Sequence, residues 1–157
     1  MNCVNGEEKN GNAGEAPRDF TRELGRALTC LFRSRKKYMG EHLREQGFSG
    51  AMYMIVMHLE HHPGATQDSI ASHLYIDKCN VARRTKRLEE LGYLRRETDP
   101  VDRRQNNLYL TDKGREIVPL IKRYLSDWGS SISMELTPEE KEMLIALLSK
   151  MTGQNQR

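Results

Sequence analysis

Apolar and polar residues follow a helical period along most of this chain. From Asp19 the apolar positions fall three and four residues apart, which predicts a long amphipathic helix ending at Gly47. Ser49 is placed to cap a second helix, and the run His62-Pro63-Gly64 is placed to end it. The N-terminal third of the chain therefore predicts two helices. Residues 1–17 before them are rich in Asn, Gly and Glu and are expected to be a disordered tail.

Two further helices follow in close succession. Thr66 is placed to cap a short third helix, and Asp77 to cap a fourth that runs to about Leu91. Gly92 directly after it is a typical helix terminator. Two helices joined by a turn of this length predict a helix-turn-helix unit.

The hydrophobic period then changes from helix to strand. Residues 93–98 and 107–111 favour two strands, and the polar segment between them predicts a hairpin with a long basic tip. Thr111 is placed to cap a fifth helix, which Pro119 should kink. The run Thr137-Pro138-Glu139-Glu140 is a capping box that opens a sixth helix.

This order of elements predicts a mainly α (α+β) fold, a winged helix-turn-helix placed between helical flanks. The expected division is a tail at 1–17, a dimerisation helix at 18–48, a DNA-binding domain at 49–111 and dimerisation helices at 112–153. The flanks are expected to dimerise because their apolar surface exceeds what one small winged domain can cover. Two copies of the chain are also needed to bind the two half-sites of a DNA site.

Composition narrows the class of protein. The chain has 157 residues, 37% of them hydrophobic and 30% charged, with a mean hydropathy of -0.75, which is typical of a globular protein. It shows neither an apolar stretch long enough for a membrane span nor a signal peptide, so we expect a cytoplasmic protein with no membrane partner. The sequence also lacks a Gly-rich phosphate-binding loop, the GxSxG and HExxH motifs and a pair of catalytic carboxylates. This argues against an enzyme and against a cofactor.

Positive charge is concentrated on the predicted fourth helix. The net charge is only +3, but residues 78–88 contain five cations and no acid, namely Lys78, Arg83, Arg84, Lys86 and Arg87. Helical geometry places Val81, Thr85 and Leu88 on an inward face. The opposite face carries Cys79, Ala82, Arg83 and Lys86, with Asn80 and Arg87 at its margin. Such a face is suited to the DNA major groove, with Arg83 matched to guanine and Asn80 to adenine.

The hairpin tip carries the second basic cluster. Arg103 and Arg104 lie on a loop where long cations have no packing role, and an arginine there can enter a minor groove. Asp102 is placed to hold Arg104 extended through a charge-assisted hydrogen bond. Together, the basic helix and the basic hairpin indicate double-stranded DNA as the partner.

The stretch from Thr66 to Thr111 resembles the winged helix-turn-helix core of the MarR (multiple antibiotic resistance regulator) family. The hairpin signature Asp-x-Arg followed by Leu-Thr-x-x-Gly falls on Asp102, Arg104, Leu110, Thr111 and Gly114, and the likeness extends over about residues 19–152. The resemblance implies a dimeric bacterial transcription regulator, usually a repressor, that leaves a pseudo-palindromic operator when it binds a small ligand or is oxidised. Arg84 and Thr85 stand where members of the family usually carry apolar residues. The expected DNA-contacting residues are Thr66, Gln67, Lys78, Asn80, Ala82, Arg83, Lys86, Arg87, Arg103 and Arg104.

The resemblance also implies a ligand pocket between the winged domain and the dimer helices. A small aromatic or phenolic effector is the expected class, and the candidate lining residues are Phe32, Arg33, Tyr53, Met57 and His58. His58, His61 and His62 have the spacing of helix neighbours, but the resemblance gives no support for a metal site, because no matching acid or histidine set appears on the predicted fifth helix. We therefore expect a solvated helix end beside Pro63 and no metal ion.

Two alternatives remain open from the sequence. The first is a redox-sensing DNA-binding regulator triggered through Cys30 or Cys79, although the reactive cysteine of the peroxide-sensing branch corresponds to Ala27 here. Cys30 is otherwise expected to be a small buried residue on the apolar side of the first helix. The second is a helical adaptor that presents its basic helix to an acidic protein.

Overall fold

The computed structural model describes residues 19–100, 103 and 105–153, and the chain divides into two compact units, Met1–Arg33 and Ser34–Arg157. Helix α1 (Phe20–His42) begins in the first unit and continues into the second. The described part of the first unit is one amphipathic helix that exposes four large apolar side chains, those of Phe20, Leu28, Leu31 and Phe32. The predicted tail at 1–17 lies outside the described residues.

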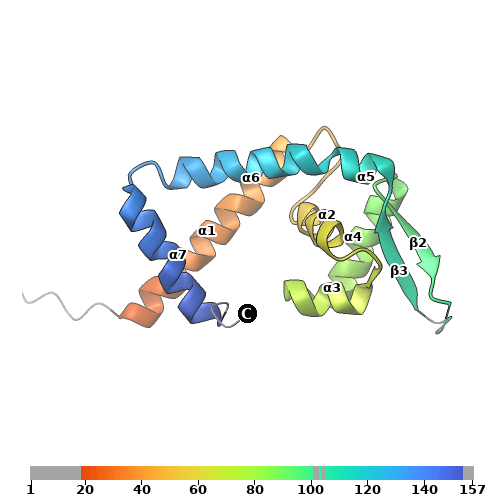
Figure 1. Cartoon of the computed structure of the whole chain (residues 1–157), viewed down its shortest axis with the longest axis horizontal. Helices are drawn as coiled ribbons and strands as arrows, with labels where there is room; N and C mark the ends of the chain where they lie inside the picture. Colours follow the sequence, from red (N-terminus) through yellow and green to blue (C-terminus); the bar gives the residue numbers. More distant parts are fainter. Residues whose placement is uncertain (1–18, 101–102, 104, 154–157) are drawn as a thin grey trace, which may run out of the picture. The chain divides into compact units, whose positions relative to one another are not determined.

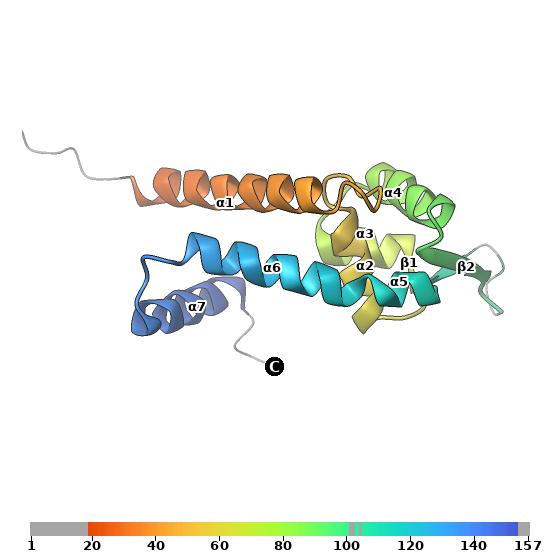
Figure 2. The same ribbon diagram turned by 90° about the horizontal axis from the view of Figure 1, so that it is seen from above.

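The second unit contains the winged helix-turn-helix (Figures 1 and 2). Its elements are α2 (Met52–His61), β1 (Ala65–Thr66), α3 (Gln67–Leu74), α4 (Lys78–Glu90), β2 (Leu94–Thr98) and β3 (Asn106–Leu110). The strands form an antiparallel sheet in the order β1-β3-β2, in which Leu94 pairs with Leu110 and Ala65 with Leu108. This confirms the predicted fold class. The sequence pattern missed β1, because two residues are too few to show a strand period.

One core holds this unit together. The buried faces of α2, α3 and α4 meet there with the inner side of the sheet and the start of α6 (Val118–Ile132), and its fully buried residues include Met39, Leu43, Ile55, Val56, Ile70, Val81, Leu88, Leu108 and Ile121. The inward face predicted for α4 is confirmed, because Val81, Thr85 and Leu88 are its buried residues. Their burial turns the basic side of the helix outward.

A glycine fixes how the chain leaves the sheet. The Thr111 hydroxyl accepts a hydrogen bond from the backbone N–H of Gly114 at 3.0 Å and so caps α5 (Asp112–Glu116). A β-carbon at position 114 would overlap the carbonyl oxygen of Tyr93. The Leu-Thr-x-x-Gly pattern therefore allows α5 to lie directly against the backbone where β2 begins.

The C-terminal helices follow the predicted start and stop signals. Pro119 lies in the first turn of α6, so the predicted kink is a break between α5 and α6. The capping box of Thr137 and Glu140 is present at the start of α7 (Pro138–Thr152). Within residues 138–152 of α7, no side chain is buried in the single chain.

Two details of the sequence interpretation are wrong. Ser49 does not cap α2, whose N-cap is Ala51, because the chain makes a turn before the helix and the Ser49 hydroxyl lies 3.3 Å from the sulfur of Met52 instead. Cys30 is exposed in the single chain rather than buried. No helix in the described part of the chain is long and apolar enough to span a membrane.

Candidate nucleic-acid interface

The turn between α3 and α4 sets the direction of the basic helix. The Asp77 carboxylate accepts a hydrogen bond from the backbone N–H of Asn80 at 3.1 Å and caps α4. Lys78 forms an exposed ion pair with Asp68 of α3 at 2.9 Å. Tyr75 ends α3 in a left-handed conformation with φ of 52°, and its side chain is 97% exposed. The sequence did not single out Tyr75, which the structure places exposed in the turn before α4.

The outer face of α4 presents the predicted DNA-contacting residues. Arg83 Nη2 donates to Asn80 Oδ1 at 2.7 Å, so the two candidate base readers lie together on the first turns of the helix. Lys86 and Arg87 are exposed further along, and Arg87 contacts Glu90 at 3.3 Å. Ala82 is half-buried between these side chains and the core. Base-reading groups near the N-terminus of a helix and cations further along are typical of a recognition helix.

A basic groove lies along one side of α4. It has a volume of about 610 Å³, and four of its lining cations belong to α4, namely Arg83, Arg84, Lys86 and Arg87. The fifth is Lys36, a residue in the part of α1 that belongs to the second unit. Burial and the neighbouring charge of Arg83 lower the pKa of Arg84. The DNA-contacting residues expected from the sequence include neither Arg84 nor Lys36; for Lys36, on a first helix with surplus positive charge, the sequence leaves open a phosphate contact or a solvated side chain.

A polar network holds α4 against α3 and β2. The Gln67 amide lies 2.8 Å from the hydroxyl of buried Thr85, and its oxygen, when turned to this side, accepts from Arg96 Nη1 at 2.9 Å. Arg96 Nη2 also donates to Thr85 at 3.3 Å, and Arg96 Nε donates to Glu89 at 2.7 Å. A hydroxyl is tolerated at the buried position 85 because the network supplies its partners. Gln67, expected to contact DNA, thus has its amide directed into the protein.

The N-terminus of α3 lies over a second depression. The Thr66 hydroxyl accepts from the backbone N–H of Ser69 at 3.2 Å, which confirms its predicted capping role. Thr66 and Gln67 line a hollow of about 310 Å³ together with Asp68, Arg96, Gln105 and Asn106. The start of the helix-turn-helix and the base of the hairpin therefore face a common space.

The hairpin is closed at the point where its tip begins. The backbone N–H of Asp99 donates to the Gln105 carbonyl at 3.0 Å, and Asn107 Nδ2 donates to the Asp99 carboxylate at 2.9 Å. Arg103 is exposed on the tip. Asp102 and Arg104 lie outside the described residues, so the expected contact between them stays a prediction.

Comparison with known proteins identifies the family. A sequence model described as the MarR family matches residues 49–105. The HTH-type transcriptional regulator YkoM of Bacillus subtilis (strain 168) is 30% identical over 127 residues, which cover 81% of this chain and 82% of the relative. The HTH-type transcriptional regulator BilQ of Clostridioides difficile (strain CD3) is 26% identical over 122 residues, covering 78% and 82%. The chain belongs to the MarR family.

Solved MarR-family structures agree with the fold. The crystal structure of MarR aligns with a TM-score of 0.78 and 29% identity over 84% of this chain and 96% of that one. A MarR transcriptional regulator from Methanosarcina mazei Go1 aligns with a TM-score of 0.81 and 28% identity over 85% and 96%. The protein is thus a winged-helix transcriptional regulator of a DNA-binding family, and this family consists of regulators rather than enzymes.

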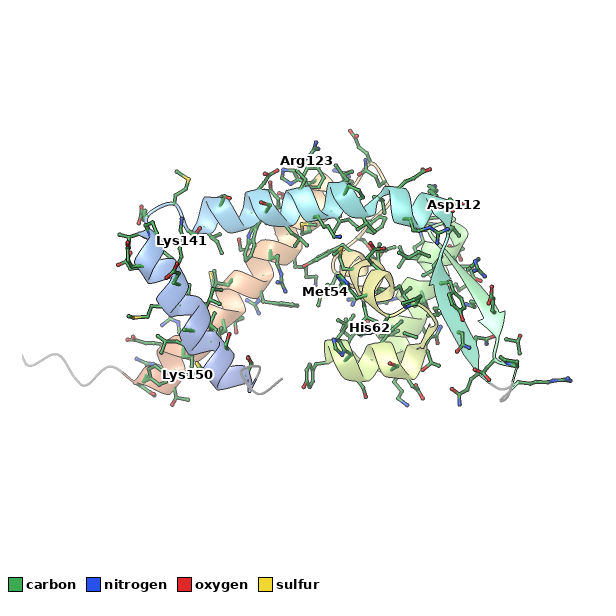
Figure 3. All side chains as sticks on the ribbon, in the orientation of Figure 1. Met54, His62, Asp112, Arg123, Lys141 and Lys150 are labelled. Carbon is green, nitrogen blue, oxygen red and sulfur yellow. The ribbon has the colours of Figure 1, made fainter. Side chains whose placement is uncertain are left out.

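A cavity of this MarR-family chain is lined by residues of α1, α2, α3 and α6. It has a volume of about 330 Å³, and three of the predicted pocket residues, Tyr53, Met57 and His58, line it. Its other lining residues are Arg35, Met54, His61, His62, His73, Leu74 and Leu125, and Figure 3 labels Met54 and His62. Burial raises the pKa of Tyr53, although Arg35 opposes the shift. Phe32 and Arg33 lie in the first unit, where both are exposed.

Of the three histidines expected at a solvated helix end, His61 and His62 are exposed, whereas His58 is buried. His58 is only 7% exposed, because its ring turns from α2 toward α3 rather than outward. His73, on α3, lies close to His58 and His62, a convergence that the sequence did not indicate. Burial, followed by the charges of His73, His62 and His61, lowers the pKa of His58 and favours its neutral ring.

Proposed function

We propose that the protein is a homodimeric, sequence-specific repressor that binds a pseudo-palindromic operator and leaves it when a small aromatic or phenolic ligand binds. The observation that carries this proposal is the outer face of α4, where Arg83 and Asn80 lie together beside a groove lined by five cations. Hydrogen-bonding groups next to phosphate-binding charges are what a protein needs to read a base sequence within a polyanion.

Each side chain of this surface has a distinct proposed contact. Arg83 makes a bidentate contact to guanine and Asn80 to adenine, while Ala82 lets the helix approach the groove closely. Phosphates are bound by Lys36, Lys78, Arg84, Lys86 and Arg87, and by Thr66 and Gln67 at the start of α3. The last two offer backbone N–H groups, since their side chains already have partners within the protein.

The hairpin supplies the minor-groove contact. Arg104 enters the groove, Asp102 holds it extended, and Arg103 contacts the adjoining phosphates. Arg103 is exposed on the tip, which supports a role toward an external partner. Readout of a narrow minor groove extends the recognised sequence beyond the bases that α4 touches.

Exposed apolar surface on the flanking helices supports dimerisation through residues 18–48 and 112–153, leaving 49–111 as the DNA-binding domain. On α7, the exposed apolar residues are Met143, Leu144, Ile145, Leu147 and Met151, and α1 exposes Phe20, Leu28, Leu31 and Phe32. Surface of this kind marks an interface with another chain. A two-fold axis between the copies would place two α4 helices about 34–36 Å apart, one turn of DNA.

Effector binding is assigned to the cavity of Tyr53, Met57 and His58. Its volume of about 330 Å³ is in the range of small-ligand sites, and Arg35 provides a cation beside the Tyr53 hydroxyl. A phenolate or carboxylate fits this combination of apolar walls and one guanidinium. We place this regulator in the bacterial cytoplasm, where operator DNA and such metabolites meet.

A DNA footprint upstream of the protein's own gene tests the proposal. We expect two protected half-sites one helical turn apart, and loss of protection when a phenolic ligand is added. Equal protection of every DNA sequence would instead indicate a non-specific cation surface. Protection of no DNA would favour an adaptor for an acidic protein. Arg123→Ala replaces an exposed arginine of α6 that does not line the basic groove, so this control variant should protect the same half-sites as the parent.

Exposed thiols favour a redox trigger as the second candidate. Cys79 is exposed on the outer face of α4, so an oxidised sulfur there would meet the DNA, and Cys30 is exposed on α1. This alternative predicts that peroxide releases the operator, whereas phenolic ligands do not. A Cys79→Ser or Cys30→Ser variant that stays bound under peroxide would identify the responsible thiol.

A further inference from the structure

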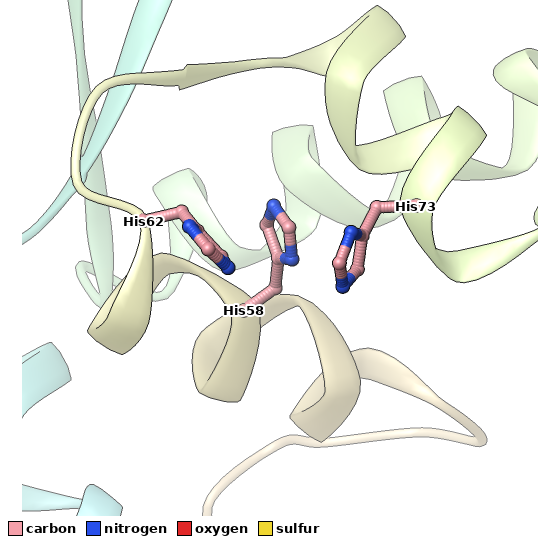
Figure 4. A group of neighbouring side chains, drawn as sticks. All are labelled: His58, His62 and His73. Carbon is pink, nitrogen blue, oxygen red and sulfur yellow. The ribbon is translucent and has the colours of Figure 1, made fainter. Parts of the chain in front are cut away.

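Three histidine side chains from two helices converge within the second unit. His58 lies on α2, His62 is the residue that ends this helix, and His73 lies in the last turn of α3. One ring nitrogen of each lies within 4.8 Å of the others. Figure 4 shows the three rings facing one another in the space between α2 and α3.

The buried member of the group has an unsatisfied nitrogen. His58 is 7% exposed, and its Nε2 atom has no hydrogen-bond partner among the described residues. A buried polar atom without a partner is unfavourable, because folding removes its water without replacing it. A bound ligand at this position would restore the missing interaction.

The spacing of the rings suits a metal ion. A zinc ion with tetrahedral geometry and Zn–N distances of about 2.0–2.1 Å holds its nitrogen ligands about 3.3 Å apart and the imidazole centres about 5 Å apart. The ring centres here are 4.7 Å apart for His58 and His62, 4.7 Å for His58 and His73, and 5.5 Å for His62 and His73. The ring centres therefore have about the separation of a three-histidine site, and side-chain rotations on metal binding would bring the nitrogens from within 4.8 Å to about 3.3 Å of one another.

We propose that His58, His62 and His73 bind one divalent transition-metal ion of the zinc class. Imidazole is a preferred ligand of Zn²⁺, Ni²⁺ and Cu²⁺, whereas Mg²⁺ and Ca²⁺ require oxygen ligands. Among the described residues, the group contains no carboxylate. Three protein ligands leave a fourth position for water, as in an open zinc site.

The ion would connect two elements that are separate in the sequence. His58 and His62 are one helical turn apart, and the chain reaches His73 only after the turn at Pro63-Gly64, strand β1 and most of α3. Binding would therefore link the end of α2 to the end of α3, the helix that packs on α4. The site stands on the histidine geometry alone and does not depend on the proposed DNA contacts.

Calorimetric titration of the full, chelator-treated chain with zinc chloride tests the site. The cysteines Cys3, Cys30 and Cys79 are replaced by serine so that exposed thiols cannot bind zinc. We expect one ion per chain, and we expect His73→Gln or His62→Gln to weaken binding by at least about tenfold. Both residues are exposed, so we expect these variants to keep the fold. Circular dichroism of each variant checks that they do.

His61→Gln and His42→Gln are the matched controls. His61 is adjacent in sequence but outside the group, and His42 stacks on Tyr38 at the end of α1. Both variants should bind zinc as the parent does. In addition, zinc should raise the Tm of the parent and not that of His73→Gln, because only the folded chain assembles the site.

Cobalt provides a readout of coordination. With Co²⁺ in place of zinc, the parent should show the visible absorption of a four-coordinate site. His58→Gln should lose this absorption. The proposal is overturned if the parent binds no zinc, if His73→Gln binds it equally well, or if His61→Gln loses as much affinity as His73→Gln.

Discussion

Arg83 and Asn80, one turn apart on α4, are joined by a hydrogen bond of 2.7 Å from the guanidinium to the side-chain amide oxygen. The backbone N–H of Asn80 donates to the capping carboxylate of Asp77, so Asn80 lies in the first turn of the helix. In the structure without DNA, the bond to Asn80 directs the guanidinium along the outer face of the helix. A side chain oriented in advance loses less conformational freedom on binding.

Replacing Arg83 should remove one base contact. We expect Arg83→Ala to cost about 1–3 kcal/mol of operator binding and to relax specificity at a single base pair. Competition binding against operators mutated at each position measures this effect. Arg123→Ala, an exposed arginine of α6, should bind as the parent does. An equal loss of affinity for random DNA would show that Arg83 contacts phosphate rather than a base.

Lys36 should contribute a phosphate contact from outside the helix-turn-helix. Because it lines the basic groove beside α4, Lys36→Ala should weaken binding to all sequences alike. The slope of log K against log salt should become shallower by about one. Lys37→Ala is the matched control, since Lys37 is exposed next to it and pairs with Glu41 at 3.9 Å. An unchanged salt slope in Lys36→Ala would remove Lys36 from the interface.

Arg104 should act through the shape of the minor groove. We expect Arg104→Ala to weaken binding most at operators with A·T-rich flanks, where the groove is narrow and its potential most negative. Affinity measured on operators that differ only in their flanks tests this. Arg103→Ala, next to it on the tip, should lose affinity without such dependence on the flanks. Equal losses by Arg104→Ala on all flanks would contradict the assignment.

Arg96 should matter for stability through the network behind α4. Arg96→Ala removes hydrogen bonds to Thr85 and Glu89, so we expect the free energy of unfolding to fall by about 1–3 kcal/mol. Urea denaturation measures it. The neighbouring Arg95 is exposed and lies over the ring of half-buried Tyr109, with the guanidinium carbon 4.9 Å from the ring centre. Arg95→Ala should therefore cost no more than about 1 kcal/mol. A larger loss in Arg95→Ala than in Arg96→Ala would contradict the network.

Tyr93 should make the fold sensitive to alkali. Burial raises the pKa of Tyr93 above its usual value of 10.0, and its hydroxyl donates to the Gln46 carbonyl at 3.1 Å. The folded state therefore keeps a proton that the unfolded state releases, so stability is intact below pH 10 and falls as the pH rises toward the folded-state pKa. Urea denaturation at a series of alkaline pH values should show a smaller fall in Tyr93→Phe.

The same variant should cost about 1 kcal/mol near neutral pH, because it loses the hydrogen bond to Gln46. Tyr75→Phe is the control, since its ring is 97% exposed. Part of the alkaline dependence should persist in Tyr93→Phe, because burial also raises the pKa of Tyr53. If Tyr93→Phe and the parent respond identically to pH, the Tyr93 hydroxyl is not part of the alkaline transition.

Local signals in the sequence determined much of the fold. Thr66, Asp77, Thr111 and Thr137 each cap the helix predicted for them, because capping depends on residues within one turn. The spacing of apolar positions likewise determined which side of α4 is buried, since a helix period is itself local. The basic outer face of α4 and the hairpin followed from the same patterns.

Only the tertiary structure decided which distant residues share a site. Lys36 lies beside α4, Gln67 and Arg96 enclose Thr85, and His73 faces His58, yet no local pattern relates the members of these groups. The two-residue strand β1 also depends on its partner β3 rather than on its own sequence. The physical reason is the same in each case: periodicity and capping act within a few residues, whereas contacts across the chain are set by how the buried faces pack together.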